Sequence, residues 1–92
     1  MLASVLSFLL KNVQDERLLT SHISLLTAIC LVGNHTKAGD EFSVSRSKLM
    51  KLSGIKGKGT YHRILSQLIE FGFIHYQSSY HPSLGSTISL IN

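Results

Sequence analysis

Cysteine and long apolar runs are scarce in this chain of 92 residues. The single cysteine, Cys30, cannot form an internal disulfide, and its apolar neighbours predict a buried free thiol, which suits a reducing cytoplasm. The run that contains it, ISLLTAICLVG, is eleven residues long, whereas a membrane helix needs about 20. The start, MLASVLSFLL, lacks the basic residues and the cleavage site of a signal peptide. We therefore expect a cytoplasmic protein without a membrane span.

Motifs for catalysis, phosphate-loop binding and metal binding are also missing. The stretch GIKGKGT has closely spaced glycines but not the G-x-x-x-x-G-K-[ST] spacing of a phosphate loop. The histidines His62, His75 and His81 include no pair at the i, i+4 spacing that places two metal ligands on one helix face. Adjacent acids fall in predicted loops, as is normal for solvated turns. We expect no enzyme activity, no metal, no cofactor and no small-molecule ligand.

Acidic residues are absent from residues 42–69, although six of the nine lysines and arginines lie there. This segment carries a charge of +6, and the other three basic and five acidic residues together carry −2. Such a distribution is typical of a surface that binds a polyanion. The alternative is a solvated helix face, but those faces usually mix charges of both signs. The six basic residues are Arg46, Lys48, Lys51, Lys56, Lys58 and Arg63.

Apolar residues at helical spacing predict four helices. The first covers about residues 2–12, within an N-terminal segment 1–14. The second begins at Thr20 or Ser21, whose hydroxyl can cap its first turn, and stops at Gly33. Its predicted buried stripe is Ile23, Leu26, Ile29 and Cys30.

Ser45 is expected to cap the third helix, which runs to Leu52, and a Gly-bearing turn, SGIKG, leads into the fourth. The fourth helix runs from about Lys58 to Phe71 and ends at Gly72. Its predicted inward stripe is Tyr61, Ile64, Leu65, Leu68 and Phe71. After Gly72 the apolar period changes to two, so FIHYQS and STISLI predict a β-hairpin around SYHPSLG. The short stretch FSV is expected to add a third strand.

Two helices joined by a short Gly-bearing turn are the signature of a helix-turn-helix, and a hairpin directly afterwards predicts a winged helix. We expect one domain over residues 1–92: a mostly helical α+β winged helix-turn-helix with an extra N-terminal helix and a three-stranded antiparallel sheet. The first helix, over residues 1–14, packs on its own core or forms a homodimer interface. Ile69, off the main stripe of the fourth helix, is a candidate contact for it.

The fourth helix would be the recognition helix, because its first turns can reach base edges in the major groove. Arginine suits guanine, glutamine suits adenine, and serine or threonine suits several bases. Gly57 and Gly59 would let the backbone approach a phosphate at the helix start. Tyr61 either stacks on a base or belongs to the core, and its spacing favours the core. The predicted DNA-binding residues are Arg46, Lys48, Lys51, Lys56, Lys58, Thr60, His62, Arg63, Ser66, Gln67 and, at the wing tip, His81.

Three stretches, TSHISLLTAICLVG, FSVSRSKLMKLSGI and TYHRILSQLIEFGFI, resemble bacterial winged-helix regulators and replication proteins of phages and plasmids. The resemblance covers roughly residues 18–91, and the wing YQSSYHPSLGS is similar to wings of small mobile-element proteins. Gly57 departs from it, because these families usually place Ser, Thr or Asn there as the helix cap. The resemblance implies a winged-helix fold that binds double-stranded DNA.

The leading expectation is sequence-specific binding of double-stranded DNA by a bacterial transcription regulator. Two alternatives remain open. One is a DNA-binding accessory factor for replication, excision or transfer of a mobile element, which neighbouring integrase or mobilisation genes would favour. The other is a winged helix that binds protein, for which the basic face would be dispensable.

Overall fold

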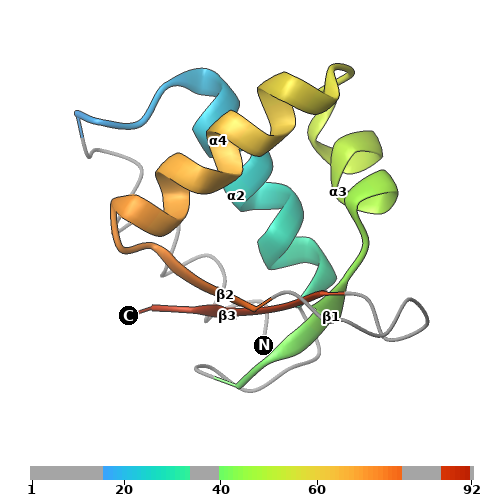
Figure 1. Cartoon of the computed structure of the whole chain (residues 1–92), viewed down its shortest axis with the longest axis vertical. Helices are drawn as coiled ribbons and strands as arrows, with labels where there is room; N and C mark the ends of the chain where they lie inside the picture. The colour runs from blue at the N-terminus through green and yellow to red at the C-terminus, as the bar shows by residue number, and fades with distance from the viewer. Residues whose placement is uncertain (1–15, 34–39, 78–85, 92) are drawn as a thin grey trace.

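Three helices lie on one face of a three-stranded sheet in the computed structural model, which describes residues 16–33, 40–77 and 86–91 (Figure 1). Their order is α2 (Thr20–Val32), β1 (Phe42–Val44), α3 (Arg46–Ser53), α4 (Lys58–Glu70), β2 (Ile74–Gln77) and β3 (Ser86–Leu90). The predicted α+β class, mostly helical with a small antiparallel sheet, is confirmed. The predicted helix over residues 1–14, with its possible dimer role, lies outside the described residues, and so does His81.

Helix α2 starts differently from the prediction. Leu19 occupies the N-cap position with extended backbone angles, φ −91° and ψ 171°, and its side chain offers no acceptor. The predicted cap by the hydroxyl of Thr20 or Ser21 is therefore wrong. Instead, the Leu19 backbone N–H donates to Nδ1 of His22 at 3.0 Å. The buried side is also shifted, because Ile23 is only half-buried while the buried residues are His22, Leu25, Leu26, Ala28, Ile29 and Cys30.

Short-range signals set the other helix ends. The Oγ of Ser45 accepts the backbone N–H of Lys48 at 3.2 Å, which confirms the predicted cap of α3. Gly54 ends α3 in the left-handed conformation, with φ 77°, and Gly72 follows α4 with φ 85°. Gly33 ends α2 as predicted, but with φ −84° it needs no left-handed backbone.

The sheet has the strand order β1-β3-β2, and both pairings are antiparallel. Ile88 on the central strand stands opposite Phe42 of β1 on one side and Tyr76 of β2 on the other. The predicted addition of FSV to the two later strands is confirmed. At one end of the β2–β3 pair, the Tyr76 hydroxyl and the Ser86 hydroxyl form a hydrogen bond of 2.8 Å.

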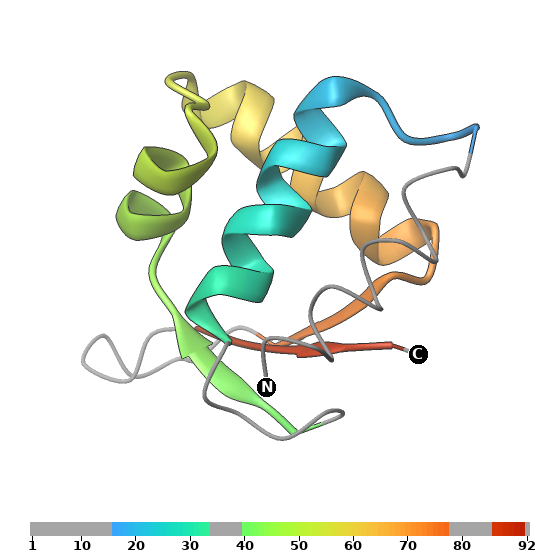
Figure 2. The ribbon, with the colours of Figure 1, turned by 180° about the vertical axis from the view of Figure 1, so that it is seen from behind.

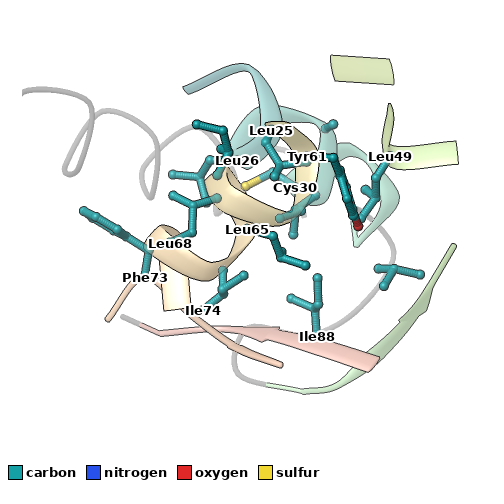
Figure 3. Packing of buried hydrophobic residues seen from close by; sticks show 14 residues of the cluster. Leu25, Leu26, Cys30, Leu49, Tyr61, Leu65, Leu68, Phe73, Ile74 and Ile88 are labelled. Atoms are coloured by element: carbon teal, nitrogen blue, oxygen red, sulfur yellow. The ribbon is translucent and has the colours of Figure 1, made fainter. Parts of the chain in front are cut away.

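One hydrophobic core lies between the helices and the sheet (Figure 3). Helix α2 lies behind α4 in Figure 1 and in front of it in the reverse view of Figure 2, so the two helices cross and pack on each other. Leu68 is fully buried and Tyr61 is 3% exposed, so both belong to the core as predicted, whereas Phe71 is half-buried. The buried apolar residues are Leu25, Leu26, Ala28, Ile29, Cys30, Val44, Leu49, Tyr61, Ile64, Leu65, Leu68, Phe73, Ile74 and Ile88.

Candidate nucleic-acid interface

The turn between α3 and α4 carries two local hydrogen bonds, both made by the Ser53 hydroxyl. The Ser53 hydroxyl donates to the Met50 carbonyl at 3.3 Å and accepts the Ile55 backbone N–H at 3.4 Å. Ile55 is half-buried and packs against the core, while Gly54 reverses the chain direction. Both helices contact α2 (Figure 2). These contacts fix the start of α4 relative to the end of α3.

Every basic residue predicted for DNA binding is exposed. Three of them belong to α3, one to the turn and two to α4. Thr60, His62 and Ser66 of α4 are exposed as well. Gln67 differs, because it is half-buried and its side chain faces α2. The exposed basic residues are Arg46, Lys48, Lys51, Lys56, Lys58 and Arg63.

Helix α4 has one apolar side and one polar side. Its buried residues recur every three or four positions, so they form a single stripe on the core. The opposite side carries His62, Arg63 and Ser66, all exposed. The first acid after β1 is Glu70, the last residue of the helix. The outward side of α4 is therefore a hydrogen-bonding and basic surface over most of its length.

Neither glycine at the start of α4 is required by internal packing. A Cβ at Gly59 would meet no atom within 4 Å, and one at Gly57 would meet Thr60 Oγ1 at an ordinary 3.5 Å. Neither residue has a positive φ. Gly57 holds the N-cap position of α4 without a side-chain acceptor, so the first amides of the helix have no side-chain cap. The backbone at this helix start is open to an outside group.

Tyr61 links the start of α3 to α4 and β2. Burial raises the pKa of its hydroxyl, the nearby Tyr76 adds to the rise, and the positive charge of Arg46 opposes it. The Tyr61 ring also lies 5.3 Å from the His62 ring, centre to centre, in an edge-on arrangement. The ring is thus fixed in the core, while Arg46 and His62 on either side of it remain exposed.

An open polar cleft of about 410 Å³ lies beside the α3–α4 turn. It separates the first turns of α2 from the turn and from the first residues of α4. Its polar lining is made of hydroxyls, one ammonium group and glycine backbone, and it contains no acid. The lining residues are Thr20, Ser21, Ser24, Ser53, Gly54, Ile55, Lys56, Gly57 and Thr60. Thr60 therefore lies on the side of α4 toward α2.

His22 was not recognised as an important residue from the sequence. It is 2% exposed, and its Nε2 lies 2.7 Å from Oε1 of Gln67. The sequence did contain a signal for a buried histidine: His22 lies among the apolar residues of α2, three residues after Leu19. The partner could not be inferred, because Gln67 lies 45 residues away in the sequence.

The described part of the chain also bears on metal binding and on membrane crossing. Over residues 16–33, 40–77 and 86–91, no three His, Cys, Asp or Glu side chains gather as metal ligands would. Among the helices described there, none combines the length and the apolar character that crossing a membrane requires. Cys30 is a buried free thiol, as predicted.

Comparisons with protein-family models, with curated proteins and with solved structures give no match for this chain. The interpretation of the site therefore depends on its own geometry and charge.

Proposed function

We propose that this chain is a winged helix-turn-helix protein that binds double-stranded DNA sequence-specifically and regulates transcription. The order of elements supports the proposal: a helix, a short strand, two helices joined by a tight turn, and two paired strands. In this interpretation α3 and α4 form the helix-turn-helix, and β2 and β3 form the wing. The strand order β1-β3-β2 places the first strand beside the last, so the FSV strand completes a three-stranded sheet with the two later strands.

The observation that carries the proposal is a run of exposed positive charge without an acid. All six basic residues between Arg46 and Arg63 are exposed, and residues 42–69 contain no Asp or Glu. Charges of one sign repel one another on a bare surface, and the phosphates of a nucleic acid would neutralise them. The open backbone at Gly57 and Gly59 suits close approach of a phosphate to the start of α4.

The two helices would have different tasks. The outward side of α4 carries His62, Arg63 and Ser66, which can hydrogen-bond to base edges in the major groove. Lys48 and Lys51 on α3 would contact the phosphate backbone, because the first helix of such a motif crosses the backbone. Phosphate contacts set position and affinity, whereas base contacts set sequence preference.

Binding to labelled duplex DNA over a range of salt concentrations tests this function. If about 4–6 phosphates are neutralised per subunit, log K should fall against log salt with a slope of about −4 to −5. Absence of binding at low salt, or an affinity that does not change between about 50 and 200 mM salt, would reject the proposal. Selection from random duplexes then tests sequence preference, because only a specific binder enriches a common site.

A further inference from the structure

A chain of hydrogen bonds joins the start of α2 to the second half of α4. The backbone N–H of Leu19 donates to Nδ1 of His22 at 3.0 Å. On the other side of the ring, Nε2 of His22 lies 2.7 Å from Oε1 of Gln67. The imidazole is 2% exposed, so both of its nitrogens are used by the protein itself.

The first of these bonds determines the rest. A backbone amide can only donate, so Nδ1 of His22 must be the acceptor and cannot carry the ring proton. The proton of the neutral ring is therefore on Nε2, which must donate. The atom of Gln67 that faces it must then be the carbonyl oxygen, Oε1, as the structure has it. The amide nitrogen of Gln67 is consequently turned away from the buried ring.

The surroundings of His22 hold this arrangement in place. The Phe71 ring lies 5.7 Å from the imidazole, centre to centre. The Arg17 guanidinium lies 4.8 Å from the centre of the Phe71 ring and 5.6 Å from that of Phe73. The aromatic ring beside the imidazole and the burial of His22 leave the ring little room to turn.

We infer that His22 is a positioning residue that holds the Gln67 carboxamide with its N–H₂ group directed to a phosphate oxygen of the DNA backbone. The inference rests on the proposed function and deepens it. Reading adenine with both ends of the carboxamide would need Oε1 to face the base, but Oε1 faces His22. Gln67 lies on the flank of α4 toward α2 rather than on its outward side, and the flank of a helix in a groove faces the groove wall, where the phosphates are.

The first test needs no DNA. Nitrogen-15 NMR of the histidine rings in the free protein, near neutral pH, should show His22 as the neutral tautomer with its proton on Nε2. Replacement of Gln67 by Met should change the Nε2 signal of His22 and leave the Nδ1 signal nearly unchanged. A ring protonated on Nδ1, either alone or together with Nε2, would overturn the inference whether or not the protein binds DNA.

The second test separates positioning from folding with two matched variants. In His22→Asn the shorter carboxamide can still accept the Leu19 amide but cannot reach Gln67. In His22→Gln the longer carboxamide can donate to Gln67. We expect His22→Asn to weaken duplex binding about threefold to tenfold, and the affinity of His22→Gln to stay within about twofold of the wild type. Both variants are measured at a temperature at which thermal unfolding shows them to be folded. Equal affinities of the two folded variants would reduce His22 to a structural role.

A third pair adds one negative charge to α4 at two positions, and both variants are compared where thermal unfolding shows them folded. Gln67→Glu keeps an acceptor for His22 but replaces the N–H₂ donor by an oxygen. Ile69→Glu, at a position 39% exposed, makes a carboxylate two residues away and serves as the control for charge. We expect Gln67→Glu to weaken binding about tenfold more than Ile69→Glu. Equal losses would overturn the phosphate contact.

If the wild type binds no duplex at low salt, the proposed function fails and the phosphate contact fails with it, whereas the NMR result still decides the tautomer.

Discussion

The Phe42 ring lies where a side chain at Gly33 would begin. A Cβ placed on Gly33 would stand 2.6 Å from both Cε1 and Cζ of Phe42, well inside van der Waals contact. The backbone of Gly33 has φ −84°, which any residue can adopt. Glycine is therefore favoured here because the Phe42 ring of β1 packs on the end of α2, and not because of backbone strain.

Gly33→Ala should lower the free energy of unfolding by about 1–3 kcal/mol, because the Phe42 ring must move out of its place. Without this contact, the same change usually stabilises a protein by about 0.4–1 kcal/mol through the unfolded state. Urea unfolding of a double-mutant cycle with Phe42→Ala measures the coupling. If Gly33→Ala is as destabilising in the Phe42→Ala background as in the wild type, the close approach is not the reason for glycine.

Leu68→Ala should lower the free energy of unfolding by about 2–5 kcal/mol, because it leaves a cavity under α4 at a position that is 0% exposed. Ile69→Ala is the matched control on the same helix turn, since Ile69 is 39% exposed and its loss should cost less than about 1 kcal/mol. Thermal and urea unfolding of both variants measure the difference. Similar values for the two would mean that the inward side of α4 is misassigned.

Cys30 should make the stability depend on alkaline pH. Burial raises the pKa of its thiol from 9.0 to about 11, because the thiolate is poorly solvated in the core. As the pH rises, the thiol of the unfolded chain therefore loses its proton before the thiol of the folded protein does. The protonated thiol contributes fully to the free energy of unfolding below about pH 9, and this contribution is lost as the pH rises through about 11.

The free energy of unfolding is measured against pH for the wild type and for Cys30→Ala. Lysines and tyrosines titrate in both proteins, so the difference between the two curves belongs to Cys30. Between about pH 9 and 11, the wild type should lose up to about 2–3 kcal/mol more unfolding free energy than this variant. Near neutral pH, the thiol of the folded protein should react slowly with alkylating reagents and quickly in denaturant. Rapid alkylation without denaturant would show that Cys30 is not enclosed.

Arg63 and Lys51 should affect DNA binding differently. Arg63→Ala should weaken the preferred site by about 1–3 kcal/mol and leave binding to a scrambled duplex mostly intact, because Arg63 is on the outward side of α4. Lys51→Ala should weaken both duplexes similarly and reduce the salt slope by about 1. Titrations with both duplexes at one salt concentration compare the variants. If Arg63→Ala weakens both duplexes equally, Arg63 contacts only phosphate.

Signals contained within one or two helical turns could be recognised in the sequence. Ser45 bonds to an amide three residues ahead, so its role as the cap of α3 follows from local chemistry. The spacing of Tyr61, Ile64 and Leu68 placed them together on the inward side of α4, because a helix has a fixed period. The exposure of the six basic residues followed from the cost of burying a charge.

Relations between distant residues were decided only by the tertiary structure. The way α2 packs on α4 brings His22 to Gln67 across 45 residues. Gln67, which was expected to read bases, is therefore half-buried and turned toward α2. The same docking turned Ile23 partly outward and brought Phe42 against Gly33. No local period encodes these contacts, because they depend on how the packed side chains of three elements fill one core. The sequence alone determined the elements and the charge, while packing decided which polar side chains remain free to meet a partner.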